Sequence, residues 1–483
     1  MKNIVILILA VLVASCSNQF DDLNNNVKDP SAVPGESLFT SGQKAMADQV
    51  TRQHVNWNNT RLWVQYSCET QYRDETNYDL VTRAIPENHW SQLYRFVLKN
   101  LEESKEVITN TDYPGEDPAI KANKLLIIEL SEIYTYSILV ETFGDIPYSE
   151  ALDVEILNPK FDDGDEVYRD LITRIEAVIN GLDPSQGSFG SYDNIYQGDV
   201  ASWMRFANSL KLRMGMLYSD ADNTFAQGLV EDAFADPAGL ILSSDQNANY
   251  HYLSTTPNTN PDYVTLVLSG RSDYVATETM VDMMAGLNDP RMDNYFTQAA
   301  GGGYIGGVVG NNNTPASNWS TFAPSIKEPT KDGVLFDDIE MNFLLSEAAA
   351  RGYNVGGTAE SYYNAGITAS ILSWGGTPAE ASAYLAQPDV AYATATGTYK
   401  QKIGTQRWLG LYPRGFESWT ALRRLDYPTL AVPTGAQSGF PVRYTYPIVE
   451  QTLNADGWYA AKNGGDNDLV TNRLWFDMFD YSH

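Results

Sequence analysis

The 483-residue chain is long enough for one large domain or about three average ones, and a chain of this size needs no disulfides to bury its core. It has 61 acidic and 32 basic residues, a formal charge of −29, and no basic run. Because such a surface repels polyanions, nucleic-acid binding is excluded. The 10 Trp, 30 Tyr and 17 Phe suit a carbohydrate-binding surface, but they suit a Tyr-rich helical core equally well.

The first residues have the pattern of a secretory signal. Lys2 precedes an apolar run over residues 4–13, which is too short for a membrane span because a span needs roughly 20 apolar residues. Small residues then lead to Cys16 in the string LVASC, which is typical of a bacterial lipobox. We expect residues 1–15 to be a signal peptide, Cys16 to be acylated and residues 16–37 to form a lipidated tether. The alternative is a signal cleaved elsewhere, with Cys16 unmodified.

The second cysteine, Cys68, has no partner for an intramolecular disulfide once Cys16 is acylated. An oxidising envelope compartment would allow Cys68 to form a disulfide, but the sequence contains no third cysteine to pair with it. We therefore expect Cys68 to be a small buried apolar residue, with a reactive thiol as the alternative.

Apolar residues at helical spacing dominate residues 38–239 and 334–425. The predicted helices, in chain order, are 87–109, 119–143, 165–180, 199–218, 223–234, 334–351, 358–374, 378–386, 400–412 and 416–425. Helices joined by short loops must pack antiparallel. The sequence therefore predicts a mainly α fold of helical hairpins of the tetratricopeptide kind, although a strict repeat of roughly 34 residues is absent.

Residues 240–333 change character. Clusters of Pro, Gly, Asn and Thr replace the helical periods, and short pieces such as 263–268 favour strands. Because a loop-rich stretch of this length in a compact protein is usually functional or disordered, we favour a functional insertion. Residues 426–483 are punctuated by proline and predicted to be mostly coil. The expected layout is one domain over residues 38–483 that includes this insertion.

Catalytic and metal-binding signatures are weak. No two of the four histidines lie within four residues of each other, so a helix-borne zinc site has no support. The string at 301–306 matches GxGxxG but follows no predicted strand, which favours a flexible loop over a dinucleotide site. The acidic strings 162–165 and 466–468 could bind a structural calcium ion, yet they lack the full ligand spacing, so turns and helix caps are favoured. We expect no metal and no cofactor.

Several strings taken together resemble the SusD/RagB family of Bacteroidetes outer-membrane lipoproteins, in particular its SusD-like branch. They are LVASC, KANKLLIIELSEIYTYSILVETFGDIPYSEAL, DIEMNFLLSEAAARGY, SYYNAGITASILSWG, IGTQRWLGLYPRGFESWTALRRLDYPTL, FPVRYTYPIVEQTLN and NRLWFD. Their order and spacing fit the family over essentially the whole mature chain. The segment 240–333 matches least.

The resemblance implies a fold with four tetratricopeptide-like hairpins as scaffold, a looped region that carries the ligand site, and no catalysis. It also implies a lipid anchor in the outer membrane, with the protein exposed at the cell surface. There such a protein covers a SusC-like TonB-dependent transporter and passes it an oligosaccharide, or in some relatives a peptide. The helical half would face this partner.

Only Cys16 carries over from the family residue by residue. Other matching residues are interpreted as elements of the fold: Gly144, Asp145, Pro147, Arg423 and Arg424. Gly144 would supply a helix C-terminal turn, and the two arginines would bond carboxylates or carbonyls between helices. No ligand residue carries over by motif.

Ligand-site candidates come from local chemistry alone, because aromatic rings and amides suit sugar recognition. They are Tyr304, Asn311, Asn312, Asn313 and Trp319 in the insertion, with Tyr78, Arg83 and Trp90 far upstream. Internal packing is the alternative for each of them. The expected function is non-catalytic glycan binding. The alternatives are a secreted glycoside hydrolase on a helical scaffold, a peptide-binding importer subunit and an adhesin.

Overall fold

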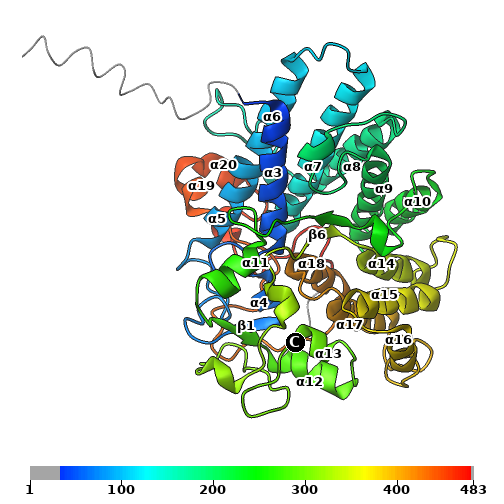
Figure 1. Ribbon diagram of the computed structural model, residues 1–483. Coiled ribbons are helices and arrows are strands. Elements are labelled where there is room, and N and C mark those ends of the chain that lie inside the picture. The colour runs from blue at the N-terminus through cyan, green and yellow to red at the C-terminus, as the bar shows by residue number, and fades with distance from the viewer. Residues whose placement is uncertain (1–32, 480–483) are drawn as a thin grey trace, which may run out of the picture.

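The computed structural model describes residues 33–479, and helices dominate it (Figure 1). The scaffold helices are α3 (Gly35–Thr51), α5 (Ile85–Ser91), α6 (Lys99–Asn110), α7 (Pro118–Phe143), α8 (Gly164–Gly181), α9 (Val200–Leu217), α10 (Asn223–Ala235), α14 (Asp338–Ala350), α15 (Ala359–Ser373), α16 (Pro378–Leu385), α17 (Tyr399–Gly410) and α18 (Gly415–Leu425). Chain neighbours pack as hairpins, notably α7 with α8, α9 with α10 and α14 with α15. The mainly α fold of tetratricopeptide-like hairpins is confirmed.

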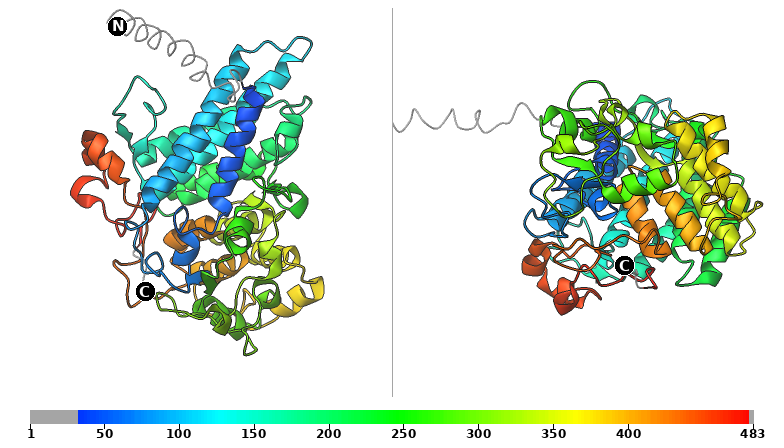
Figure 2. Two further views of the ribbon diagram at one scale, coloured as in Figure 1. Left: turned by 60° about the vertical axis from the view of Figure 1, so that its left-hand side comes forward. Right: turned by 90° about the horizontal axis from the view of Figure 1, so that it is seen from below.

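The hairpins form a curved stack. In Figure 1 it runs from α6 and α7 at the top, through α9 and α10 at the right, to α15 and α16 below. Two short C-terminal helices, α19 (Ile448–Leu453) and α20 (Ala455–Ala460), project from one side in both views of Figure 2. The remaining short elements are α4 (Thr60–Trp63), α11 (Pro261–Tyr263), α12 (Glu278–Gly286), α13 (Met292–Tyr295) and the 3-10 turns at Gly190–Tyr192, Ser244–Gln246, Ala316–Asn318, Pro324–Lys327 and Gly465–Asn467.

Helix ends follow the capping chemistry of the sequence. Asp117 accepts a hydrogen bond from the Ala119 N–H at 2.9 Å and starts α7, and Gly144 ends it with φ +88°. The role predicted for Gly144 is confirmed. The predicted helix 87–109 also forms, but its middle is a π-helical segment, Gln92–Leu98, between α5 and α6.

Strands are few among residues 33–479, and they form three antiparallel two-stranded sheets. The pairs are β1 (Ser67–Glu69) with β5 (Tyr274–Ala276), β2 (Ile146–Pro147) with β3 (Phe161–Asp162), and β4 (Ala248–Tyr250) with β6 (Gly333–Phe336). The start of the predicted helix 334–351 is therefore wrong: Val334 pairs with Asn249 in a sheet, and α14 begins only at Asp338. The partner strand lies more than 80 residues upstream, and local periodicity cannot show it (Gly333 pairs with Tyr250).

Two further predictions about local structure are wrong. Residues 263–268, predicted to favour a strand, continue α11 as a π-helical segment, Val264–Leu268. The Asn260 side chain accepts a bond from the Asp262 N–H at 2.7 Å, and Pro261 occupies the first turn, so a helix start overrides the β-branched residues that follow. Residues 35–37, predicted to belong to the tether, form the first turn of α3.

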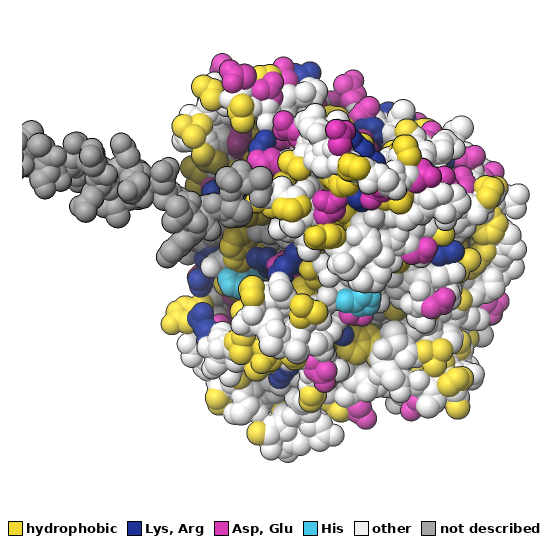
Figure 3. Space-filling model, turned by 45° about the horizontal axis from the view of Figure 1, so that its top comes forward, with side chains coloured by type: hydrophobic (Ala, Val, Ile, Leu, Met, Phe, Trp, Pro, Cys, Tyr) yellow, Lys and Arg dark blue, Asp and Glu magenta, His cyan; other side chains and the backbone are white. Residues whose placement is uncertain are grey.

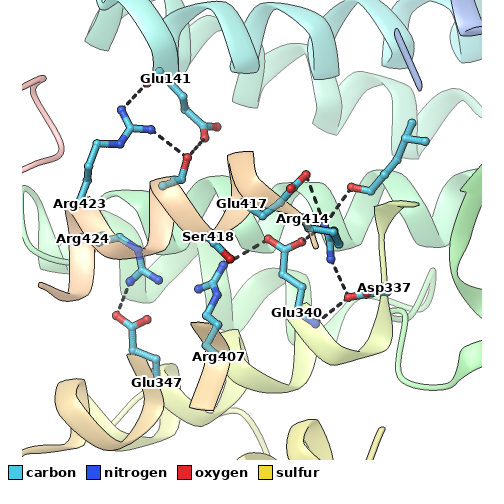
Figure 4. A network of polar contacts seen from close by, with 12 residues as sticks. Glu141, Asp337, Glu340, Glu347, Arg407, Arg414, Glu417, Ser418, Arg423 and Arg424 are labelled. Carbon is cyan, nitrogen blue, oxygen red and sulfur yellow. Dashed lines mark hydrogen bonds and ion pairs between the residues drawn. The ribbon is translucent and has the colours of Figure 1, made fainter. Parts of the chain in front are cut away.

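One continuous apolar core joins the hairpins to the insertion, and a smaller core lies where α14, α15 and α17 meet. A buried network of arginines and carboxylates connects helices of the stack (Figure 4). Arg414 binds Asp337 at 2.8 Å and Glu340 at 2.6 Å, and Arg424 pairs with Glu347. Arg423 donates to the backbone oxygen of Glu141 at 2.5 Å, so the predicted inter-helix role of the two arginines is confirmed.

No helix within residues 33–479 is long and apolar enough to cross a bilayer. The predicted signal peptide, the acylated Cys16 and the tether up to residue 32 lie outside the described residues.

Candidate functional site

Three loop-rich segments, 52–84, 255–277 and 300–322, fold against each other as one layer at the lower left of Figure 1, which we call the loop layer. The pairing of β1 with β5 ties the first segment to the second. The first and third segments are joined by the Asn313 N–H, which donates to the Thr70 oxygen at 2.9 Å, and by Asn77 Nδ2, which donates to the Gly310 oxygen at 3.0 Å. The layer thus brings Tyr78 and Arg83 together with the insertion candidates.

Two of the predicted ligand residues are buried, and one of them, Asn313, links segments of the layer. Asn313 is 1% exposed, and its amide donates to the Glu69 oxygen at 3.0 Å while accepting from the Val308 N–H at 2.9 Å. Tyr78 is 4% exposed, has φ +68°, and packs its ring edge-on against Phe440.

Arg83 and Trp90 differ in their relation to the layer. Arg83 is part of it and forms an ion pair with the fully buried Glu75. Trp90 lies on α5 and is 8% exposed, with its ring in an aromatic cluster that includes Phe143 and Phe161. The structure therefore does not bring Trp90 together with the other candidates.

The remaining four candidates reach the surface of the layer. Asn311 and Asn312 are exposed, and Tyr304 and Trp319 are half-buried. The Tyr304 hydroxyl donates to Asp293 at 2.5 Å, and Trp319 Nε1 donates to the Asn313 oxygen at 2.8 Å, so both rings are held in place. The ligand role of all eight candidates stays a prediction.

Sequence reasoning missed several basic and aromatic side chains on the same layer. The Arg52 guanidinium lies 5.0 Å from the centre of the Trp57 ring, and Tyr72 is 64% exposed. The string RQHVNWNN at 52–59, which interleaves basic, aromatic and amide residues, was the available signal. On the face drawn in Figure 3, Lys and Arg side chains gather beside a histidine toward the left, while Asp and Glu crowd the top.

Burial shifts the pKa values of two titratable groups in this layer. Burial and three nearby arginines, Arg52, Arg271 and Arg83, lower the pKa of His54 to about 4, so its ring is neutral at neutral pH. Burial and the hydrogen bond to Glu75 raise the pKa of Glu69 to about 9, so the layer carries less negative charge than its sequence suggests.

Cys68 lies on β1 inside the layer, fully buried, and burial raises the pKa of its thiol well above the ordinary value. This is the buried role expected from the sequence, and a thiol held in its neutral form is a poor nucleophile.

In the acidic strings 162–165 and 466–468, carboxylates accept hydrogen bonds from backbone N–H groups. Asp163 accepts from the Asp165 N–H at 3.0 Å at the start of α8, and Asp468 accepts from the Tyr446 N–H at 3.1 Å and from Arg443 at 2.9 Å. Asp163 has the cap role favoured for the first acidic string. The second string lies in the 3-10 turn Gly465–Asn467, but Asp468 bonds residues that are distant in sequence. Within the described part of the chain, no group of three or more His, Cys, Asp or Glu side chains is arranged to hold a metal ion.

The fold and sequence match known proteins over nearly their whole length. A solved structure of a chitin-binding protein is 26% identical, with a TM-score of 0.79, and the match covers 92% of this chain and 100% of that one. A chitin-binding SusD homolog from Flavobacterium johnsoniae is 24% identical (TM-score 0.76, 91% and 98% covered). A SusD homolog from Bacteroides uniformis is 23% identical (TM-score 0.75, 92% and 99% covered).

No curated protein matches the chain. The model of the SusD-like family described as "Starch-binding associating with outer membrane" matches residues 25–447, which is most of the sequence. The chain therefore belongs to this SusD-like family.

Proposed function

We propose that this protein is a non-catalytic glycan receptor, anchored by lipid in the outer membrane, that captures oligosaccharides at the cell surface and passes them to a SusC-like TonB-dependent transporter. The observation that carries the proposal is the family match over residues 25–447, because the family is described as starch-binding and as associating with the outer membrane. The chitin-binding protein at 26% identity supports a glycan ligand as well.

The loop layer is the part of the molecule that we assign to capture. It combines the exposed ring of Tyr72, the half-buried rings of Trp57 and Trp319, and the exposed amides of Asn311 and Asn312. Flat rings suit the C–H faces of sugars, and amides bond their hydroxyls. Because the rings come from loops that are pinned by β1, β5 and Asn313, they are ordered before a ligand arrives, which lowers the entropy cost of binding.

The anchor and the partner are assigned from the sequence and the family. The lipobox at Cys16 would tether the folded part through the segment that precedes α3. The hairpins from α6 to α10 lie at the top and right of Figure 1, away from the loop layer at the lower left, which leaves them available for the transporter.

Glycan capture is tested by isothermal titration calorimetry of the mature protein against starch, chitin oligosaccharides and other polysaccharides, with product analysis on the same samples. We expect saturable binding of at least one glycan and no cleavage. Tyr72→Ala should weaken this binding roughly two- to tenfold, which is the usual contribution of one stacked ring. Tyr72 is 64% exposed, so the variant should fold normally.

Tyr459→Ala is the matched control, because Tyr459 is also 64% exposed but lies on α20 outside the loop layer. It should leave the affinity unchanged. Cleavage of the bound glycan would favour the hydrolase alternative, and binding of peptides without glycans would favour the peptide importer. Binding of neither ligand, or equal loss in both variants, would overturn the proposal.

A further inference from the structure

The ribbon formed by β1 and β5 ends in the loop layer, at the lower left of Figure 1, with an exposed ring and an exposed guanidinium group. Its pairing continues past the strands, because the Thr70 N–H donates to the Asp273 oxygen at 2.8 Å and the Thr70 hydroxyl donates to the Ser272 oxygen at 2.9 Å. Tyr72 and Arg271 each lie two residues beyond the last of these pairs, Thr70 with Asp273, so they leave the ribbon at the same end. Tyr72 is 64% exposed, and the side chain of Arg271 is 61% exposed.

The backbone at Tyr72 is strained. Its φ is +49°, in the left-handed region that a bulky side chain rarely adopts. Among residues 33–479, eight residues other than glycine have a positive φ, and four of them lie within the short stretch 65–84. A fold keeps such strain only where its surroundings impose it, and strained positions cluster at ligand sites. The strain therefore marks this part of the loop layer as a candidate contact surface.

Hydrogen bonds on both sides fix the turn that carries this tyrosine. The Thr70 oxygen accepts from the Asn313 N–H at 2.9 Å. The Arg73 oxygen accepts from Asn77 Nδ2 at 2.9 Å. The side chains at positions 71–73 are all exposed. The turn therefore presents an amide, an aromatic ring and a guanidinium group to solvent from a fixed backbone, which lowers the entropy cost of binding a ligand.

The surface of the loop layer is basic, although its sequence is not. Its three segments contain five arginines and six carboxyl groups. Four of the carboxyl groups are buried: Glu69, Glu75, Asp79 and Asp262. Four of the arginines are exposed or half-buried: Arg52, Arg73, Arg83 and Arg271. On a protein with a net charge of −29, this surface is a place where an anion meets positive charge.

Further positive charge lies beside the ribbon end. Burial lowers the pKa of His54 to about 4, and the charges of three arginines act in the same direction: Arg52, Arg271 and Arg83. Arg271 also pairs with Asp273 at 2.9 Å, which orients its guanidinium group and offsets part of its charge. The ribbon end thus lies within reach of more than one arginine.

A guanidinium group and an exposed ring at one end of a ribbon narrow the class of sugar. Arginine binds a carboxylate, or a similar oxyanion such as sulfate, through two parallel charge-assisted hydrogen bonds, which a neutral hydroxyl cannot match. A flat ring suits the C–H face of the same sugar. Because the net charge of −29 repels long polyanions, a short acidic oligosaccharide fits this surface better than a long polymer.

We propose that the end of the β1–β5 ribbon is a subsite for one acidic sugar, with the sugar ring on Tyr72 and its carboxylate or sulfate bound by Arg271 and Arg73. The subsite rests on the proposed function, since it narrows glycan capture by the loop layer to a class of glycan. A neutral glycan with the same rings binds there more weakly, because it offers the arginines no charge.

The test is calorimetry of the mature protein with pairs of short oligosaccharides that differ mainly in charge. The pairs are oligogalacturonate with its methyl ester, a glucuronoxylan oligosaccharide with the unsubstituted xylan oligosaccharide, and a carrageenan oligosaccharide with its desulfated form. We expect at least one acidic member to bind roughly tenfold more tightly than its neutral partner. The pair that shows this preference identifies the anion as a carboxylate or a sulfate.

Arg271→Gln and Arg73→Gln should each lower this preference roughly threefold, because each removes one charged donor from an exposed position. Arg271→Lys keeps the charge without the paired donors, so it should retain part of the preference. Arg95→Gln is the matched control, because Arg95 is exposed too but lies on the π-helical segment Gln92–Leu98, outside the loop layer. It should leave the preference unchanged.

Equal affinity within every pair, or a preference that Arg271→Gln and Arg73→Gln both leave intact, would overturn the acidic subsite. The result is separable from the fate of the proposed function. If the two members of a pair bind equally and Tyr72→Ala weakens both, glycan capture stands and the acidic subsite fails. If no oligosaccharide or polysaccharide binds the wild type, both fail.

Discussion

At the scale of single residues, the loop layer contains a buried pair of carboxyl groups, Glu69 and Glu75, directly beneath its surface. Glu69 accepts bonds from the Thr76 N–H at 3.0 Å and from its hydroxyl at 2.8 Å. Burial, together with the hydrogen bond and the charge of Glu75, raises the pKa of Glu69 from 4.5 to about 9. Glu69 therefore keeps a proton in the folded state at pH values where it loses it in the unfolded state.

This pair predicts a pH dependence of stability with a definite sign. Between pH 4.5 and about 9 the folded state binds more protons than the unfolded state, so the free energy of unfolding falls as the pH rises. Glu69→Gln removes this effect and keeps the acceptor for Thr76. Its melting temperature should exceed that of the wild type at about pH 8, and the difference should shrink at about pH 5.

The control is Glu231→Gln on the surface of α10, where hydrogen bonds from Asn354 and Gln227 lower the pKa of the carboxyl. That group stabilises the fold above pH 4.5 and loses its effect as the pH falls, so the variant should show no gain at alkaline pH. A Glu69→Gln variant that is less stable than the wild type at about pH 8 would contradict a protonated Glu69.

The role of a residue could be predicted where it depends on neighbours along the chain or where its string matches the family. The cap at Gly144 and the arginines of α18 are parts of local strings, and their roles were predicted correctly. Asn313 bonds Glu69 across 244 residues, and Arg61 meets Asp262 across 201. No spacing in the sequence signals such contacts, so the way the loop layer is assembled became visible only in the fold.

At the scale of elements, helix ends were predicted within a few residues because caps, prolines and glycines mark them. The helix predicted over 358–374 forms as α15, Ala359–Ser373, and Thr358 and Ser361 form a capping box at its start. The short strands and the π-helical segments were missed, because each depends on a distant partner or on an extra residue in a regular helix.

The end of α7 gives a prediction at this scale. Gly144 has φ +88°, and a Cβ atom there would lie 2.9 Å from Leu474 of the C-terminal region. Gly352, just after α14, also has φ +88°, but a Cβ atom there would meet no atom within 4 Å. Gly352→Ala should therefore cost about 1 kcal/mol of backbone strain, and Gly144→Ala at least roughly 1 kcal/mol more, because Leu474 must move and the ψ of Gly144, −113°, lies outside the left-handed helical region.

Urea denaturation of the two variants measures this difference. Equal losses would show that the contact between α7 and the C-terminal region contributes nothing to stability.

At the scale of the whole molecule, the helical hairpins form the scaffold and the loop layer carries the candidate ligand residues. The buried arginine network and the continuous core hold the hairpins as one stack, which leaves the pinned loops of the layer to present side chains (Figure 4). The acidic surface, with its net charge of −29, disfavours anionic ligands over most of the molecule. The basic surface of the loop layer offsets this barrier locally, and it is where we place the acidic sugar.

The central claim is that this protein grips a glycan on its loop layer and leaves it intact. The most direct measurement is a crystal structure of the mature protein with the polysaccharide fragment that binds best in calorimetry. The account predicts an uncleaved chain of sugar rings lying against Tyr72 and Trp57, with the helical hairpins free of ligand. A fragment bound along the hairpins, or one found hydrolysed in the site, would contradict it.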